Sequence, residues 1–156
     1  MRLRTLKLPK QRHLLRRKQG AENAPETMML PGARLRYLFS LARLCRENGG
    51  ARAVELAAML GVTRPSVHRM MEALKKQGLV RQNGSLLCLT QQGQKVLEQY
   101  QEEYDVFLLF FHRSLGFSLL ESEDSAIGLL GALCPDCRHA LADFLGKSEN
   151  KETGSF

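Results

Sequence analysis

The sequence has no stretch of about 18 apolar residues, the length at which a helix can cross a bilayer. No apolar run follows the basic N-terminus, so a secretory signal is not expected. The four cysteines of the 156 residues are too few and too unevenly spaced for a secreted disulfide-rich scaffold. These absences predict a cytoplasmic protein that does not enter a membrane.

Motifs for covalent chemistry are also missing. We find no paired nucleophile and base, no glycine-rich phosphate loop and no complete metal-binding motif. We therefore expect that the protein is not an enzyme. Its 44% hydrophobic and 25% charged residues are ordinary for a globular protein of one domain, or of one domain with an extension.

Acidic side chains are absent from the first 20 residues, which carry eight lysines and arginines. Residues 32–84 carry ten basic and three acidic side chains, whereas residues 85–156 carry five and eleven. A basic first half of the folded part is typical of a surface that binds a polyanion such as DNA. The alternative is that these charges are merely solvated and carry no function.

The first half of the folded part has the pattern of three helices and a hairpin. Apolar residues recur at three- and four-residue steps, and glycines follow where each helix should stop. Asn83-Gly84, between two short apolar runs, is a strong hairpin signal. We expect helices over about residues 35–48, 52–60 and 63–77, and strands over 79–82 and 85–89.

The second half is predicted to be entirely helical, with helices over about residues 91–115, 121–133 and 135–146. Helix, helix, tight turn, helix and hairpin is the winged helix-turn-helix arrangement. The expected fold class is mainly α, with a winged helix-turn-helix DNA-binding domain followed by an all-helical dimerisation domain. The predicted divisions are a basic, disordered arm (1–31), the DNA-binding domain (32–92), the helical domain (93–146) and a disordered tail (147–156).

The third helix would be the recognition helix, which places its N-terminal residues at base edges in the major groove. Arginine can reach guanine or a phosphate, and hydroxyl, amide or imidazole groups can donate to either. Arg52 opens the second helix, and the unpaired backbone N–H groups at the start of a helix favour a phosphate. The predicted DNA-binding residues are Arg52, Thr63, Arg64, Ser66, His68, Arg69, Lys75, Lys76, Arg81, Gln82 and Asn83.

Several short segments together carry a family resemblance: Glu47–Arg52, Val54–Ala57, Leu60–Val62, Pro65–Val67, Gly78–Val80, Leu89-Thr90 with Gly93, and Leu133–Asp136. With them, residues 35–143 resemble the diphtheria-toxin-repressor and manganese-transport-regulator family of bacterial repressors. The resemblance implies a homodimer that binds a palindromic double-stranded operator in the cytoplasm, on the nucleoid. It also implies a chain without the third, SH3-like domain of some members.

The same resemblance implies Mn²⁺ or Fe²⁺ as a cofactor, but the corresponding ligand positions hold other residues. The first-helix acidic pair would fall at Arg36 and Phe39, and the long-helix histidine at Tyr104. The remaining ligands would fall at Ile127, Leu130 and Gly131. We expect packing in place of the metal site, and therefore assign no metal ligand.

Two other effector sites stay open. Relocated ligands for a true Mn²⁺ or Fe²⁺ repressor would come from Glu102, Glu103, His112, Glu121, Glu123, Asp124 or His139. Cys134 and Cys137 form a CxxC pair at a helix start, where a thiol switch is plausible and half a zinc site is present. The structural alternative makes Cys134 a helix cap, with Cys45 and Cys88 as buried small residues.

The apolar run over 106–111 covers nearly all sides of its helix, so it is either core or a partner surface. The family dimerises in this region, and the predicted dimerisation residues are Phe107, Phe110, Phe111, Ile127 and Leu130. The arm would contact phosphates or a minor groove, unless translation starts at Met28 or Met29. The sequence thus predicts a homodimeric transcriptional repressor. The alternative is a winged-helix module that binds other proteins and does not bind DNA specifically.

Overall fold

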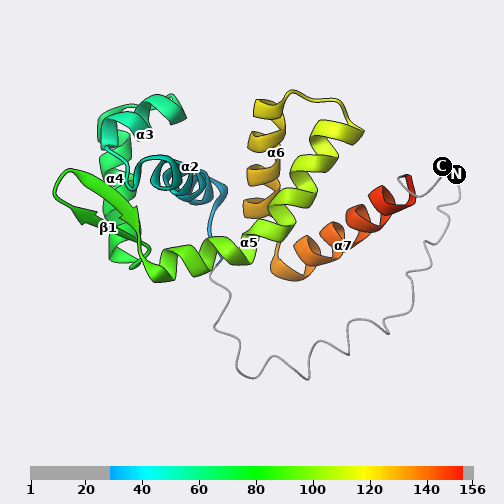
Figure 1. The fold of residues 1–156 in the computed structure, drawn as a ribbon. Coiled ribbons are helices and arrows are strands. Elements are labelled where there is room, and N and C mark those ends of the chain that lie inside the picture. Colours follow the sequence, from blue (N-terminus) through cyan, green and yellow to red (C-terminus); the bar gives the residue numbers. More distant parts are fainter. Residues whose placement is uncertain (1–28, 153–156) are drawn as a thin grey trace, which may run out of the picture.

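The computed structural model describes the backbone of residues 29–152 and the side chains of residues 29–147. The mainly α fold class is confirmed. A winged helix-turn-helix occupies one end, and α5 runs from it to the helices α6 and α7 at the other end (Figure 1). The elements are α2 (Gly32–Asn48), α3 (Ala53–Leu60), α4 (Arg64–Lys76), β1 (Val80–Asn83), β2 (Leu86–Leu89), α5 (Gln91–Leu109), η1 (Phe110–Ser114), α6 (Leu119–Ala132) and α7 (Pro135–Glu152).

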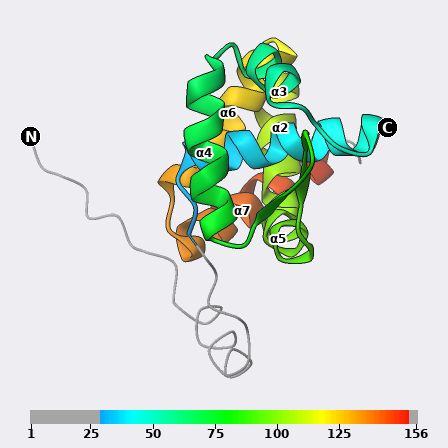
Figure 2. The same cartoon turned by 90° about the vertical axis from the view of Figure 1, so that its left-hand side faces the viewer.

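Glycines in the left-handed region separate the first three helices. Gly49 ends α2 with a φ of 74°, and Gly61 ends α3 with a φ of 64°. A side chain would be strained at either angle, so these residues fix where the chain turns. The short turn after Gly61 brings α4 across α3, and α4 lies in front of α2 when the molecule is viewed from this end (Figure 2).

The wing is a two-stranded antiparallel hairpin in which Val80 pairs with Leu89 and Asn83 with Leu86. Its loop is Gly84-Ser85, one residue later than predicted, because Asn83 still pairs within β1. Gly84 has a φ of 60°, and no described residue other than glycine has a positive φ. A glycine at the first loop position is the pattern of a type II′ turn, rather than the type I′ turn typical of Asn-Gly.

Three predicted boundaries are wrong. The α-helix of α5 stops at Leu109, and a wider π-helical turn follows, closed by the N–H of Leu115 donating to the carbonyl of Phe110. α6 starts two residues early because Ser118 caps it, accepting from the N–H of Glu121. α7 continues through part of the predicted tail, since one helical glycine costs only about 1 kcal/mol and lysine and glutamate favour helix.

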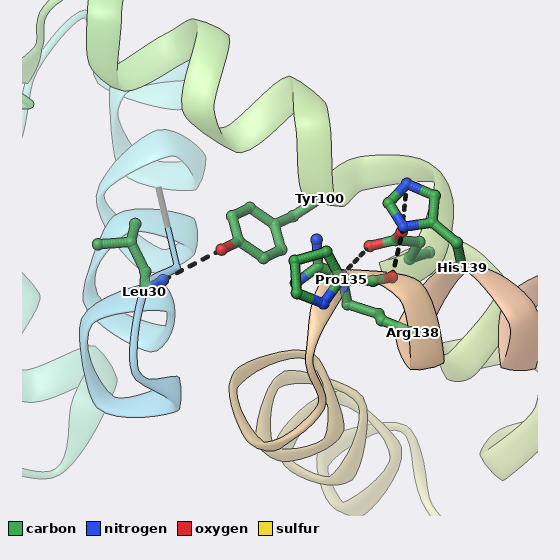
Figure 3. Close-up of polar contacts among 6 residues, drawn as sticks. Leu30, Tyr100, Pro135, Arg138 and His139 are labelled. Atoms are coloured by element: carbon green, nitrogen blue, oxygen red, sulfur yellow. Dashed lines mark hydrogen bonds and ion pairs between the residues drawn. The ribbon is translucent and has the colours of Figure 1, made fainter. Parts of the chain in front are cut away.

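The predicted arm is only partly described, because residues 1–28 lie outside the described chain. Its end is ordered: Leu30 is buried, and its N–H donates to the hydroxyl of Tyr100 at 3.1 Å. Behind the Tyr100 ring, 4.4 Å from its centroid, lies the guanidinium of Arg138, which is ion-paired with Glu103 (Figure 3). A buried polar cluster therefore joins the start of α2 to α5 and α7.

The start of α2 lies directly on α6. A Cβ atom at Gly131 would lie 2.2 Å from the nitrogen and 2.5 Å from the Cα of Gly32. This close approach is possible because Gly131 has no side chain, whereas a Cβ atom at Gly32 would lie 3.4 Å from the carbonyl oxygen of Ile127. This contact seats the helix-turn-helix on the C-terminal helices, within one continuous apolar core. Among the described helices, none is long and apolar enough to span a bilayer.

We predict that Gly131→Ala destabilises the protein by about 1–3 kcal/mol, because the new methyl group meets backbone atoms that cannot move aside. Gly128→Ala, one turn earlier on the same helix, is the matched control, since nothing lies within 4 Å of its Cβ position. That control should be neutral or stabilising. Urea unfolding followed by circular dichroism measures both, and equal stabilities would contradict this helix contact.

Candidate nucleic-acid interface

α4 has one buried face and one exposed face. Val67, Met71 and Leu74 are buried against the other helices and fix the rotation of α4 about its axis. Thr63 caps its first turn, where the Thr63 hydroxyl accepts from the N–H of Ser66 at 3.4 Å. Pro65 suits this turn because its missing N–H would have no helical partner there. The recognition helix is thus held by local capping and by burial of one face.

Arginine, lysine and histidine side chains cover the exposed face of α4. Arg64, His68, Arg69 and Lys76 are all exposed, and none of them makes an ion pair with a described residue. Guanidinium and ammonium groups left without an internal partner are available to an outside anion. This face is the one that a helix-turn-helix presents to the major groove.

Two predicted contact residues are occupied within the protein. The hydroxyls of Thr63 and Ser66 lie 2.9 Å apart, so each already has a partner. Likewise the N–H of Arg52 donates to the carboxylate of Glu55 at 2.7 Å. This carboxylate caps the N-terminus of α3, where the sequence suggested a phosphate, while the Arg52 side chain remains exposed.

The wing is braced against α4. Lys75 is ion-paired with Glu72 and also donates to the Gln82 side chain at 3.0 Å. The Gln82 amide in turn donates to the carbonyl of Gly84. The hydrogen bond from Lys75 lowers the pKa of Glu72 below its ordinary value, so the pair is ionised at neutral pH. Lys75 and Gln82 therefore fix the angle of the wing, while Arg81 and Asn83 stay exposed.

The structure adds one residue that the sequence analysis missed. Arg34, from the first turn of α2, lines a hollow of about 350 Å³ together with Ser66 and Arg69 of α4. The hollow adds another guanidinium beside the recognition helix. Only helical periodicity was visible around residue 34, and periodicity carries no information about contacts with an element 30 residues later.

The six positions that correspond to the family's metal ligands do not offer a set of donors. The rings of Phe39 and Tyr104 are stacked with centroids 4.7 Å apart. Burial raises the pKa of Tyr104 to about 12, so its phenol is neutral. Arg36 pairs with Asp124 at 3.1 Å. Ile127 and Leu130 of α6 are buried, and Gly131 lies against Gly32 at the start of α2.

The residues considered for a relocated metal site are largely dispersed. Across the described residues, no three histidine, cysteine, aspartate or glutamate side chains gather as a metal would require. Glu103 and His139 do meet, with Nε2 of His139 3.1 Å from Oε1 of Glu103. Nδ1 of His139 lies 2.6 Å from the carbonyl of Pro135, and Glu103 is already paired with Arg138.

The predicted dimerisation residues divide into two groups. Phe107, Ile127 and Leu130 are buried within the single chain, where their exposed fractions are 0%, 7% and 1%. Their assignment to a dimer surface is wrong, because the core already covers them; apolar periodicity does not distinguish core from interface. Phe110 and Phe111 are half-buried, with ring centroids 5.6 Å apart.

Comparisons with known proteins agree with this geometry. The IclR helix-turn-helix domain family matches residues 40–84, which run from α2 to the tip of the wing. The transcriptional regulator MntR of Escherichia coli O6:H1 is 34% identical over 73 residues, covering 45% of this chain and 46% of MntR. The chain thus aligns with about half the length of this curated relative.

Solved structures share the fold. The manganese regulator SloR superposes with a TM-score of 0.62 at 21% identity, covering 76% of this chain and 55% of SloR. IdeR of T. acidophilum gives a TM-score of 0.60 at 17% identity, covering 72% of this chain and 53% of IdeR. Identities this low show the fold alone. Taken with the MntR relative and the helix-turn-helix match, they confirm that this chain resembles the diphtheria-toxin-repressor and manganese-transport-regulator family and carries a helix-turn-helix of the DNA-binding type.

Proposed function

We propose that this protein is a sequence-specific DNA-binding transcriptional regulator, a repressor that acts on double-stranded DNA in the bacterial cytoplasm. The observation that carries the proposal is the exposed face of α4, where Arg64, His68, Arg69 and Lys76 have no internal ion-pair partner among the described residues. The buried face of the same helix fixes their direction. Docking α4 in the major groove puts its N-terminal turns nearest the base edges.

The side chains of this face divide into two roles. Arg64 and Arg69 are long enough to reach guanine O6 and N7, the commonest specific contact of arginine in the major groove. Lys76 at the end of α4, Arg52 just before α3 and Arg81 on the wing are suited to phosphates, which position the protein without reading sequence. His68 and Asn83, which are exposed, would supply shorter polar contacts, whereas the Thr63 and Ser66 hydroxyls are engaged with each other.

We predict that Arg69→Ala weakens binding to an operator by about 10- to 100-fold and reduces discrimination against competitor DNA, as loss of one bidentate base contact does. The probe is fluorescently labelled DNA from upstream of the protein's own coding region, titrated by anisotropy at fixed salt. Arg113→Ala is the control, because Arg113 is exposed on η1, at the end of the molecule away from the helix-turn-helix. Equal affinities for both variants would favour the protein-interaction module.

The regulator is proposed to act as a homodimer, which would present two recognition helices to a palindromic operator. The support is an exposed apolar patch where η1 turns into α6, consisting of Leu115, Phe117, Leu119 and Leu120 with exposed fractions of 44–70%. Phe111 continues it, with its ring centroid 6.3 Å from that of Phe117. Apolar side chains gathered in this way mark an interaction surface. A second copy of the chain is the occupant we propose.

We predict that Leu120→Lys converts the dimer to a monomer, because Leu120 is 70% exposed in one chain and a buried unpaired ammonium would be costly in a dimer. Light scattering coupled to size exclusion measures the mass. Val54→Lys, at an exposed apolar position of α3, should leave the mass unchanged. A wild-type protein that is monomeric at micromolar concentration would overturn the dimer and leave the DNA titration to stand by itself.

The metal dependence of the family is proposed to be lost here. Mn²⁺ and Fe²⁺ prefer carboxylate and imidazole ligands, whereas the corresponding positions hold an aromatic stack, an arginine, two buried aliphatic side chains and a glycine. These residues do not fit a metal ion. The packing between α2, α5 and α6 would therefore hold permanently the arrangement that a metal would otherwise stabilise.

We predict that operator affinity is unchanged, within about twofold, by EDTA or by added Mn²⁺ or anaerobic Fe²⁺, because no ligand set at this position would respond. The same anisotropy titration tests it, with Mg²⁺ added as a control for general screening of phosphates. Binding that requires Mn²⁺ or Fe²⁺ but not Mg²⁺ would mean that a relocated site exists. Glu103 and His139 would then be the first residues to replace.

A further inference from the structure

Cys134 and Cys137 lie at the start of α7, on the surface. Both are exposed, and they are spaced by the three residues that bring two side chains to one face of a helix. Cys134 is the cap: its carbonyl accepts from the N–H of Arg138 at 2.9 Å. The two thiols also lie close enough to shift each other's pKa in opposite directions. The α7 dithiol, as we call this pair, is therefore accessible, and its two thiols are neighbours.

The two sulfur atoms are not equivalent. The backbone N–H of Cys137, and then its thiol, donate to Cys134 and lower the Cys134 pKa below its ordinary value. The hydrogen bond and the negative charge from Cys134 raise the pKa of Cys137. A thiolate is the reactive form of cysteine, so Cys134 is the nucleophile of the pair and Cys137 is the thiol that can resolve its oxidised form.

The chain contains a second cysteine pair that serves as an internal comparison. Cys45 on α2 and Cys88 on β2 are both half-buried, and the Cys45 thiol donates to the carbonyl of Leu87 at 3.7 Å. Burial raises the pKa of Cys45. A buried thiol of raised pKa reacts slowly with oxidants. Oxidation should therefore discriminate between the two pairs.

We propose that the α7 dithiol is an oxidative modification site, at which a hydroperoxide converts Cys134 and Cys137 into an intrachain disulfide. The Cys134 thiolate attacks one peroxide oxygen: an S–O bond forms, the O–O bond breaks, and the alcohol leaves after taking up a proton. Cys134 is then a sulfenic acid, and the peroxide has accepted two electrons. Cys137 attacks this sulfur, an S–S bond forms, and the oxygen leaves as water.

The position of the dithiol connects it to the helix-turn-helix. Cys134 caps α7 and Cys137 lies in its first turn, so a disulfide, which holds two Cβ atoms about 3.5–4.5 Å apart, would constrain that turn. Arg138, the next residue, is only 1% exposed and is paired with Glu103 against the Tyr100 ring. The Tyr100 hydroxyl holds Leu30, two residues before α2 (Figure 3). A constraint on that turn would act on Arg138 and, through this cluster, on the contact between α2 and the C-terminal helices.

The chemical part of the proposal is tested without DNA. The reduced full-length protein is treated with stoichiometric hydrogen peroxide, quenched by alkylation and mapped by peptide mass. We expect the Cys134–Cys137 disulfide to form first, with Cys45 and Cys88 still alkylated. Cys137→Ser should instead accumulate a Cys134 sulfenic acid that dimedone traps. Oxidation that begins at Cys45 or Cys88, or no disulfide between 134 and 137, would overturn the site.

The regulatory part rests on the proposed function, and its test keeps the two separable. Operator affinity is measured first with fully reduced protein, so a failure to bind there concerns the proposed function alone. Oxidised wild type and the oxidised double variant Cys45→Ser/Cys88→Ser should both lose at least fivefold in affinity, and dithiothreitol should restore it. Oxidised Cys134→Ser should bind as the reduced protein does. A complete α7 disulfide with unchanged affinity would refute the coupling.

Discussion

The buried ion pair of Glu103 and Arg138 determines how α5, α7 and the segment that enters α2 meet. Taking two such charges out of water costs several kcal/mol per ion, and their attraction offsets this only with good geometry and added hydrogen bonds. Here the Tyr100 ring covers the guanidinium, and the Tyr100 hydroxyl accepts from Leu30. Replacing the pair with apolar groups could be neutral, but removing one partner typically costs 3–5 kcal/mol. Its contribution is therefore to the specificity of the arrangement of α5, α7 and the entry to α2.

That arrangement matters because it positions α2, which contacts both α6 and the recognition helix α4. The first turn of α2 lies on α6 through two glycines, and its later turns support the recognition helix. Under the proposed loss of the metal site, the stack of Phe39 and Tyr104 occupies one of the positions from which a metal would hold these helices. An aromatic stack has no second state to which removal of an ion could switch it. Regulation of this chain would then have to act through other contacts between α2 and the C-terminal helices. One of these runs through Tyr100 and Arg138, and Cys137 of the α7 dithiol is the residue before Arg138.

How far the sequence predicts the structure depends on whether the signal is local. Gly49, Gly61, Thr63 and the hairpin of the wing are specified by their own neighbours, so the winged helix-turn-helix and its exposed cations could be read directly. The pairing of Glu103 with Arg138 joins residues that are 35 positions apart, and no local sequence pattern predicts it. The π turn, which is one hydrogen bond wider than an α turn, also leaves no periodic signal.

Candidate site residues follow the same division. Exposure of Arg64 and Arg69 follows from the helical period alone, whereas the use of Lys75 and Gln82 to brace the wing depends on a contact between two elements. The dimer prediction failed at Phe107, Ile127 and Leu130 for a related reason, because a run of apolar residues indicates burial and does not say by what. The exposed patch from Leu115 to Leu120 was overlooked because it lies at a turn, where periodicity ends. Turns are therefore where the structure adds most to the sequence, and in this chain the exposed apolar patch lies at the turn between η1 and α6.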